Sequence, residues 1–593
     1  MLSDAYFLLT NPLHVRYLLG MYLRTTQRRN KNGSTVQYYQ LAENVWDPQR
    51  GCSVAKVIYN FGRADQVDPQ SLQRLAKSIV RLFPDATTPP PEAPELLLRQ
   101  SWPYGGVYVL AHLWQELGVP QLLAQCLRAK GKTQPLEAAL FVMVANRALA
   151  PSSKRCCWDQ WLAHEVFLPQ AAGVQLHHLY SAMDLLEAHK ESIEKELYFR
   201  MADLMNADVD LVFYDTTSLH FEVDEEDEVP LTHHQRRYEP LRKRGYAKNG
   251  RSDAPQLVVG LAVTREGLPV RSWVFSGQTA DVTTVEQVKQ DLRGWRLGRC
   301  VFVGDAAMNS EANRRHLSLG GGKYILASRM RAGDEVSTQV LTRPGRYKTV
   351  ADNLRVKEVW VGEGERRRRY VLCHNPLEEQ RQRAHRDKLL QALEAELASL
   401  QAPDAAGGPS KRMCELRTSG RFSRYLRQRA DGSLCIDRAA VAEAAHYDGK
   451  WVVTSNDDTL SAEDLALGYK QLLRVEECWR TLKSSLRLRP VYHWRPWRIQ
   501  AHVSLSVLAL LLERIVELRT QDTWRNVSAQ LQRLQVVEYE RDGARIRQTT
   551  EPRPEVLALL TKLRVPPPPR LHAVEPASPS VATAMDDPSI ADA

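Results

Sequence analysis

The stretch VDLVFYDTTSLHFEV, at residues 209–223, decides the fold. It is rich in β-branched and aromatic residues, and two similar runs follow it, QLVVGLAVT at 256–264 and PVRSWVFSG at 269–277. The connections are short enough for antiparallel pairing. A helix-spaced segment, 283–295, then precedes the run CVFVGD at 300–305. A helical crossover predicts that this fourth strand joins in parallel.

Two aspartates stand at comparable places in these runs. Asp215 lies within the first run and Asp305 ends the fourth, so we expect them to project from neighbouring strands, with WVVTSN at 451–456 as a fifth strand. Ligands tend to gather at the carboxyl ends of strands in open α/β sheets. Asp215 alone could equally be an ordinary turn or edge residue, whereas this alternative is weaker for Asp305, which follows the buried-looking run CVFVG.

A third carboxylate, Glu476, lies in YKQLLRVEECWRTLK at 469–483. Tyr469, Glu476, Arg480 and Lys483 follow one another at steps of seven, four and three residues, which places them within a narrow arc of one helix face. Ser461 and Asp464 form a capping pattern that predicts the helix start near Ser461. Gly468 is a weak point of this helix.

Carboxylates are the ligands that hard cations such as Mg²⁺ prefer. Two such ions about 4 Å apart can stabilise the attacking and the leaving oxygen of a phosphodiester. Asp215, Asp305 and Glu476 are therefore predicted to be the catalytic residues and to hold two Mg²⁺ or Mn²⁺ ions. His493 and His502 are expected to pack or to contact phosphate, since imidazole is a poor partner for Mg²⁺.

These segments resemble DDE transposases of bacterial insertion sequences, in the hairpin-forming branch with a Tyr-x2-Arg-x3-Glu-x6-Lys signature. Tyr469, Glu476 and Lys483 match the spacing, but Leu472 stands at the arginine position, so Arg474 or Arg480 is expected to substitute. The resemblance runs from about residue 21 to 520. It implies an RNase H-like α/β core and a catalytic-domain insertion, which we expect to be mostly β.

The resemblance also implies a function. The protein is expected to bind terminal inverted repeats, cut the element ends by metal-dependent hydrolysis and transesterification, and join them to target DNA as a homodimer. The route is expected to be cut-and-paste through a DNA hairpin, for which Trp451, Trp479 or Trp494 could stack on an extruded base. The predicted DNA contacts are Tyr469, Lys483, Arg480, Arg474, Lys248 and Arg251. Arg366 to Arg369 are either further phosphate contacts or a solvated charge run.

The chain of 593 residues is too long for one core. The expected units are a possible upstream extension (1–20), a β-rich N-terminal module with a Pro-rich linker (21–100), a helical DNA-binding or scaffold region (101–206), the first segment of the RNase H-like core (207–330), the insertion (331–449), the second segment of that core with C-terminal helices (450–565) and a disordered tail (566–593).

Composition agrees with a polyanion partner. Lys plus Arg number 80 against 70 Asp plus Glu, giving a net charge of +10. The nine cysteines include no Cys-x-x-Cys pair, which favours reduced thiols in a cytoplasmic protein. The resemblance implies that this cytoplasm is bacterial and that the protein is associated with the nucleoid. The apolar run at 503–512 is too short to cross a bilayer and is expected to be a buried helix, so no membrane partner is expected.

Three rival functions stay open on the sequence. A related nuclease could cleave without joining, and a domesticated DNA-binding protein could carry idle carboxylates. A glycosidase with two acids is more remote, because it gives Lys483 and the basic composition no role.

Overall fold

The computed structural model describes residues 21–29, 35–47, 50, 52–82, 96–128, 135–205, 210–246, 250–295, 300–331, 335–364, 367–400 and 411–576. The chain divides into two compact units, Met1–Leu97 and Leu98–Ala593. The predicted extension at 1–20 and the end of the predicted tail lie outside the described residues.

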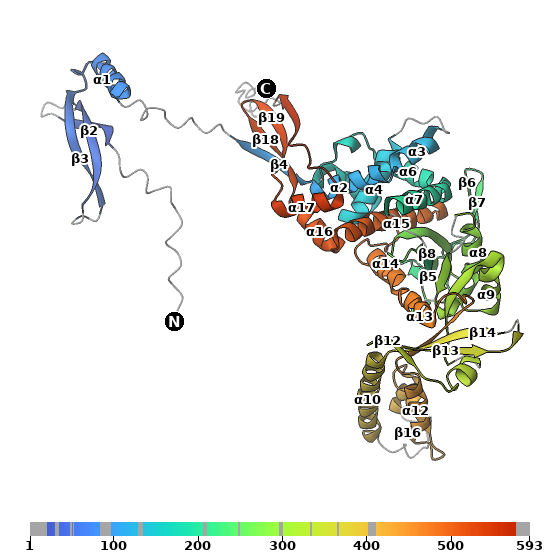
Figure 1. The fold of residues 1–593 in the computed structure, drawn as a ribbon. Helices are drawn as coiled ribbons and strands as arrows, with labels where there is room; N and C mark the ends of the chain where they lie inside the picture. The colour runs from blue at the N-terminus through green and yellow to red at the C-terminus, as the bar shows by residue number, and fades with distance from the viewer. Residues whose placement is uncertain are drawn as a thin grey trace, which may run out of the picture. The chain divides into compact units, whose positions relative to one another are not determined.

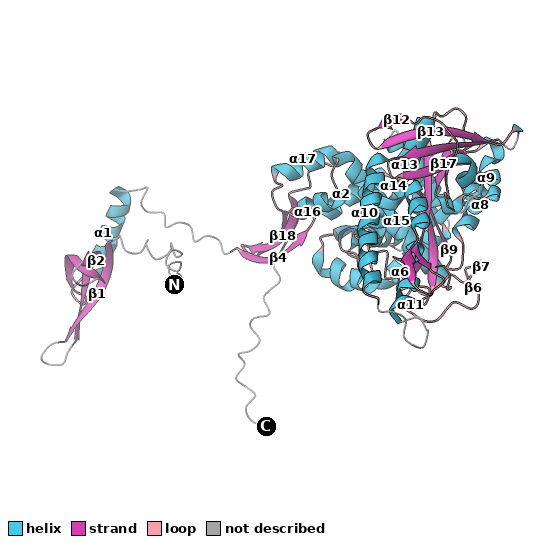
Figure 2. Cartoon of the chain, turned by 90° about the horizontal axis from the view of Figure 1, so that it is seen from below, coloured by secondary structure: helices cyan, strands magenta, loops and turns pink. Residues whose placement is uncertain are grey.

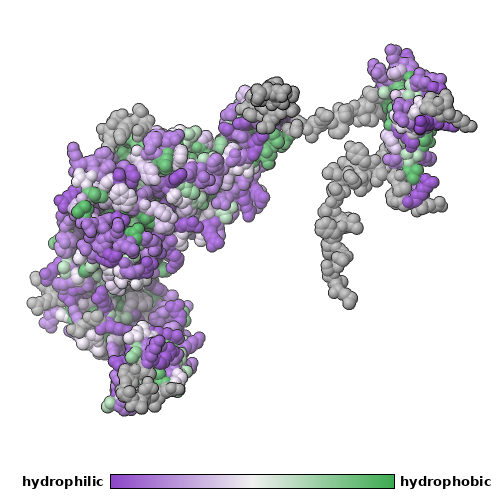
Figure 3. Space-filling model, turned by 180° about the vertical axis from the view of Figure 1, so that it is seen from behind, coloured by the Kyte–Doolittle hydropathy of each residue, from purple (hydrophilic) through white to green (hydrophobic). Residues whose placement is uncertain are grey.

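The first unit is a small β-meander with a helix. Strands β1 (Met21–Arg29), β2 (Thr35–Asp47) and β3 (Cys52–Arg63) form an antiparallel sheet in that order, followed by α1 (Pro69–Leu82). The predicted β-rich module is therefore confirmed. It leaves several large apolar side chains exposed, including Leu23, Ile58 and Ile79. Figure 3 shows green patches on the surface of this unit.

A nine-stranded sheet organises the second unit. In spatial order its strands are β12 (Lys348–Ala351), β13 (Leu354–Val361), β14 (Arg368–His374), β17 (Lys450–Ser455), β11 (Lys323–Ser328), β10 (Val301–Gly304), β5 (Leu211–His220), β8 (Gln256–Val263) and β9 (Pro269–Ser276). β5, β8 and β9 pair antiparallel, and β10 joins β5 in parallel after helix α8 (Asp281–Asp291). The predicted β-β-β-α-β order is confirmed (Figure 1).

The predicted fifth strand was wrong. WVVTSN forms β17, but the strand beside β10 is β11, which pairs with it in parallel. A second helix, α9 (Glu311–Ser318), makes the crossover from β10 to β11. β17 then pairs antiparallel with β11 and so takes the sixth position.

Helices cover both faces of the sheet. Figure 2 shows α14 (Leu473–Lys483) and α15 (Pro496–Thr520) on one side, and α8 and α9 on the other. α15 is long and apolar enough to cross a membrane by length and composition, but 89% of that window is buried inside the protein. It is the core helix that the apolar run at 503–512 predicted.

The region predicted to be helical is confirmed. Its main helices are α2 (Gly105–Glu116), α3 (Val119–Arg128), α4 (Leu136–Leu149), α6 (Leu176–Ala188) and α7 (Lys190–Met205). α4 and α6 pack against each other and against α15. This layer therefore shares one hydrophobic core with the sheet.

The insertion is mixed rather than mostly β. Its strands β12, β13 and β14 extend the core sheet through β17. Beyond them the chain forms α10 (Pro376–Ala398), α11 (Lys411–Thr418), a short hairpin and α12 (Arg438–His446), with a small core of its own. The three strands pair with the edge of the core sheet at β17. The rest of the insertion is mainly helical and buries its apolar side chains in its own small core (Figure 1).

The predicted disordered tail begins too early. β20 (Leu571–Pro576) pairs with β19 (Ala544–Thr549), in a four-stranded sheet that also holds β18 (Gln535–Arg541) and β4 (Leu97–Pro103). The edge of β19 supplies backbone hydrogen-bond partners for β20, and the Pro-rich composition of the tail does not predict this pairing.

Candidate active site

Asp215 lies in the middle of β5, between two residues that are tied to α8. The Tyr214 hydroxyl donates to Thr284 Oγ1 at 2.9 Å, and the Thr216 hydroxyl donates to Asp281 Oδ1 at 2.5 Å. Because side chains alternate along a strand, Asp215 points to the opposite face. That is the face on which α14 packs against β5.

Asp305 stands directly beside Asp215 in the sheet. Gly304 of β10 is the register partner of Tyr214 in β5, so the two aspartates follow at the same level on neighbouring parallel strands. Adjacent strands lie about 4.8 Å apart. Asp305 ends its strand as the N-cap of a short 3₁₀ turn, where its Oδ1 accepts from the Ala306 N–H, and its side chain is exposed.

Glu476 projects from the first turn of α14. The helix buries Val475, Cys478, Trp479 and Leu482, which pack it onto the sheet. Glu476, Arg480 and Lys483 lie on its exposed side. The prediction that these three share one face with Tyr469 is therefore confirmed for Glu476, Arg480 and Lys483 but wrong for Tyr469.

The helix that carries Tyr469 is a separate one. α13 (Ala462–Lys470) begins after Ser461, whose side chain accepts from the Asp464 N–H, as predicted. Gly468 is not the break: it is buried, and a Cβ there would touch Ile325 and Leu211 of the sheet. The chain breaks instead at Gln471 and Leu472, where i→i+3 hydrogen bonds replace the α-helical ones.

The charges of all three carboxylates act on Tyr469. The half-buried phenol has a raised pKa, first because of burial and then because of the negative charges of Asp305, Glu476 and Asp215. The two aspartates lie at the same level of neighbouring strands, and α14, which carries Glu476, packs against β5.

The donor set fits a hard divalent cation. All three groups are carboxylates, and neither Asp305 nor Glu476 forms an ion pair with a described Lys, Arg or His. Within the described ranges, no three His, Cys, Asp or Glu side chains are close enough together to hold a metal as they stand. The metal-ligand role of the trio therefore stays a prediction, supported by the gathering of like charges around Tyr469.

The residues predicted to contact DNA differ in whether they already form ion pairs within the protein. Arg474 is held by Glu477 at 3.0 Å, and Arg251 by Asp253 at 3.0 Å and Glu222 at 3.7 Å. Arg480 is exposed and forms no ion pair with a described carboxylate. Arg480 is thus the better substitute for the family arginine. Lys248 lies outside the described residues.

Leu472 itself is buried. A charged arginine at this position would lose its hydration without a partner, which accounts for the departure from the signature.

A cleft of about 630 Å³ opens beside Lys483. Its wall is the segment RPVYHW (489–494), of which the sequence analysis singled out only His493 and Trp494. Arg489 also lines it and contacts His220 at 3.1 Å. The run of Arg, Tyr, His and Trp just after the catalytic helix was the signal that could have found it.

The structure separates the three candidate tryptophans. Trp494 is 58% exposed and lines this cleft, whereas Trp479 is only 5% exposed and packs in the core. Trp451 is partly buried against the same core. Of the three, Trp494 is the one placed to stack on a base.

A buried basic cluster supports this cleft from beneath. Arg147 donates to the carbonyl oxygens of Leu486 and Arg487 at 3.3 and 3.1 Å, and His502 Nε2 lies 3.1 Å from the Leu488 carbonyl. Burial lowers the pKa of His493 to about 3. His502 is therefore a packing residue that fixes the loop.

Lys154 in this cluster predicts a pH dependence of stability. Burial, and then the charge of Arg147, lower its pKa to about 7, against 10.5 for the ordinary lysine. The unfolded chain binds the extra proton between these values, so stability rises with pH from 7 to 10.5, by about 1.4 kcal/mol per unit at most. We expect Lys154→Met to raise stability at pH 7.5 and to flatten this rise, measured by urea denaturation at pH 7 and 9. Arg155→Met, the exposed neighbour, should leave the slope unchanged; a wild-type slope in Lys154→Met would contradict the assignment.

The sheet order fits the RNase H-like core of the DDE class of enzymes. The family model of the transposase DDE domain matches residues 225–512, and that of the IS1634 family transposase N-terminal domain matches residues 23–88. The two together cover more than half of the chain, which is a DDE-type insertion-sequence transposase.

Other comparisons add little. No curated protein matches the sequence. A cryo-electron microscopy structure of a piggyBac transposase synaptic complex with hairpin DNA aligns over 68% of this chain and 70% of that chain, with 9% sequence identity and a TM-score of 0.34. A similarity at that TM-score carries no argument about this chain.

Proposed function

We propose that this transposase cuts the ends of its own element at the terminal inverted repeats and joins them to target DNA. The observation that carries the proposal is the placement of Asp215 and Asp305 at the same level of neighbouring parallel strands, with α14, which carries Glu476, packed against β5. Their three negative charges would repel one another and the DNA unless cations balance them. This requirement supports a site for two Mg²⁺ or Mn²⁺ ions.

Each side chain has a role in this proposal. Asp215, Asp305 and Glu476 would hold the ions, which when bound activate the attacking oxygen and stabilise the leaving one. Tyr469 of α13 and Lys483 of α14 would position phosphates at the edge of the site, assisted by Arg480, which lies on the exposed side of α14 with Lys483. No covalent enzyme intermediate is needed.

We propose that cleavage passes through a DNA hairpin, in which a base at the element end leaves the base stack. Trp494, Lys483 and Arg489 line one cleft, which offers an aromatic face beside two cations. Such a cleft suits a splayed nucleotide with its phosphate. We propose that two copies of the chain act on paired ends in the cytoplasm.

The test is cleavage of a labelled duplex that carries one element end. Mg²⁺ or Mn²⁺ should support nicking and then joining to a target plasmid, and EDTA should abolish both while binding persists. Nicks that never lead to joined products would favour a plain nuclease. Binding with no metal-dependent cleavage would favour a domesticated DNA-binding protein.

A further inference from the structure

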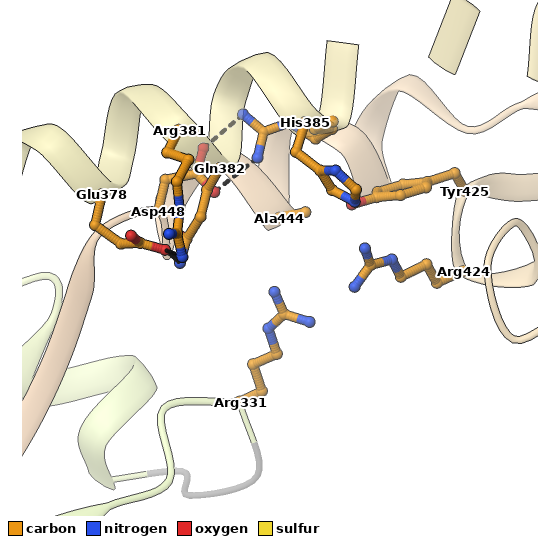
Figure 4. A pocket seen from close by; sticks show the side chains of 10 residues that line it. Arg331, Glu378, Arg381, Gln382, His385, Arg424, Tyr425, Ala444 and Asp448 are labelled. Atoms are coloured by element: carbon orange, nitrogen blue, oxygen red, sulfur yellow. Dashed lines mark hydrogen bonds and ion pairs between the residues drawn. The ribbon is translucent and has the colours of Figure 1, made fainter. Parts of the chain in front are cut away.

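A strongly basic pocket lies in the insertion, apart from the catalytic trio. It has a volume of about 550 Å³ and is lined by four arginines, Arg331, Arg381, Arg386 and Arg424, with His385. Arg331 follows β11 of the core sheet, whereas the others come from α10 and the 3₁₀ turn Ser423–Tyr425. Figure 4 shows Arg331 and Arg424 pointing into the same open space from different segments.

The two acids of the pocket are already engaged. Asp448 pairs with Arg386 at 2.6 Å, with both side chains almost fully buried, and Glu378 pairs with Arg381 at 3.0 Å. Arg331 and Arg424 form no ion pair with any carboxylate in the described ranges. Each instead lies over a tyrosine ring, Arg331 over Tyr447 at 4.9 Å and Arg424 over Tyr425 at 4.7 Å. Two cations are thus held in place by aromatic rings, and no carboxylate of the described residues pairs with either of them.

Two arginines of the run at 366–369 are already bound to carboxylates. Arg368 pairs with Glu335 and Glu311, both at 2.6 Å, and Arg369 is buried against Glu358 at 2.8 Å. Arg367 lies over the Trp360 ring at 4.0 Å, and Arg366 lies outside the described residues. Arg368 and Arg369 therefore have structural roles and are not the anion-binding residues of the insertion.

We propose that this pocket grips the phosphodiester backbone of DNA through Arg331 and Arg424. Guanidinium groups bind phosphate oxygens in a bidentate way, and stacking on tyrosine orients them without neutralising them. The pocket is larger than one phosphate group requires, which suits a stretch of backbone. The inference rests on the proposed function, since it assigns the insertion a second grip on the same DNA.

The experiment measures DNA binding by the full chain against salt. Fluorescence anisotropy with a labelled element-end duplex gives the slope of log K against log [KCl], to which each phosphate contact contributes about 0.9. Arg331→Gln with Arg424→Gln should make the slope shallower by about 1.8 and weaken binding about tenfold near physiological salt. The matched control is Arg412→Gln with Arg438→Gln, which removes two exposed arginines of the same insertion that pair with glutamates outside the pocket. It should keep the wild-type slope.

Further arms separate the alternatives. Arg331→Lys with Arg424→Lys should restore the slope, and thermal melts should show all variants folded. Equal slopes for wild type and the pocket variant, or an equal loss in the control, would overturn the proposal. So would calorimetric binding of inorganic phosphate to the pocket without a change of DNA slope, which would make it a small-anion site. If the wild type neither binds nor cleaves the duplex, the proposed function itself fails.

Discussion

Glu476→Gln should abolish cleavage of the element ends, with a loss of roughly 10³- to 10⁴-fold, while DNA binding stays within a few-fold of wild type. The substitution keeps the size of the side chain but removes the charge that faces Tyr469 together with those of Asp305 and Asp215. Single-turnover cleavage on denaturing gels, with binding measured in parallel, gives both quantities.

The adjacent glutamate provides the control. Glu477→Gln removes the same charge one residue away, but Glu477 is engaged with Arg474, and an exposed pair of this kind contributes about 0–1 kcal/mol. Its cleavage rate should change less than a few-fold. Equal losses in the two variants would remove Glu476 from the active site.

Trp494→Ala should slow hairpin formation and resolution at the element end by about 5- to 150-fold, because stacking of one base on an aromatic ring contributes about 1–3 kcal/mol. Initial nicking should change much less. Trp494→Phe should retain most of the activity. The intermediates are resolved on denaturing gels from a doubly labelled duplex.

Two comparisons sharpen this test. The base at each terminal nucleotide is removed in turn, and the hairpin rate is measured for wild type and for Trp494→Ala. At the position whose base stacks on Trp494, removal of the base should slow the wild type but should not slow Trp494→Ala any further. Trp479→Ala should instead destabilise the protein by about 3–5 kcal/mol, because its ring is buried in the core. Additive losses at every abasic position would exclude Trp494 as the stacking residue.

Local patterns predicted the catalytic half of the fold well. The β-branched runs around Asp215, the helix before β10 and the Ser461 cap each depend on neighbours in sequence, so they could be inferred without coordinates. The shared face of Glu476, Arg480 and Lys483 follows from helix geometry in the same way.

The errors all concern partners that are distant in the chain. The break at Leu472 depends on burial against other elements, and the roles of Arg368 and Arg369 depend on Glu311, Glu335 and Glu358. β20 forms a strand because it pairs with the edge of β19, and the strands of the insertion join the sheet because β14 pairs with the edge of β17. The convergence on Tyr469 could be expected only from the family resemblance, since no spacing along the sequence measures a distance across a sheet.

The insertion is joined to the core by the hydrogen bonds of one continuous sheet. β17 is hydrogen-bonded to β11 of the core on one edge and to β14 of the insertion on the other. From β14, Arg369 also donates to the carbonyl oxygens of Asp457 and Leu460, in the loop that leads to Ser461 and α13. Removal of the insertion would therefore leave one edge of β17 without backbone partners and the loop before α13 without two hydrogen bonds, so we expect it to disturb the helix that carries Tyr469.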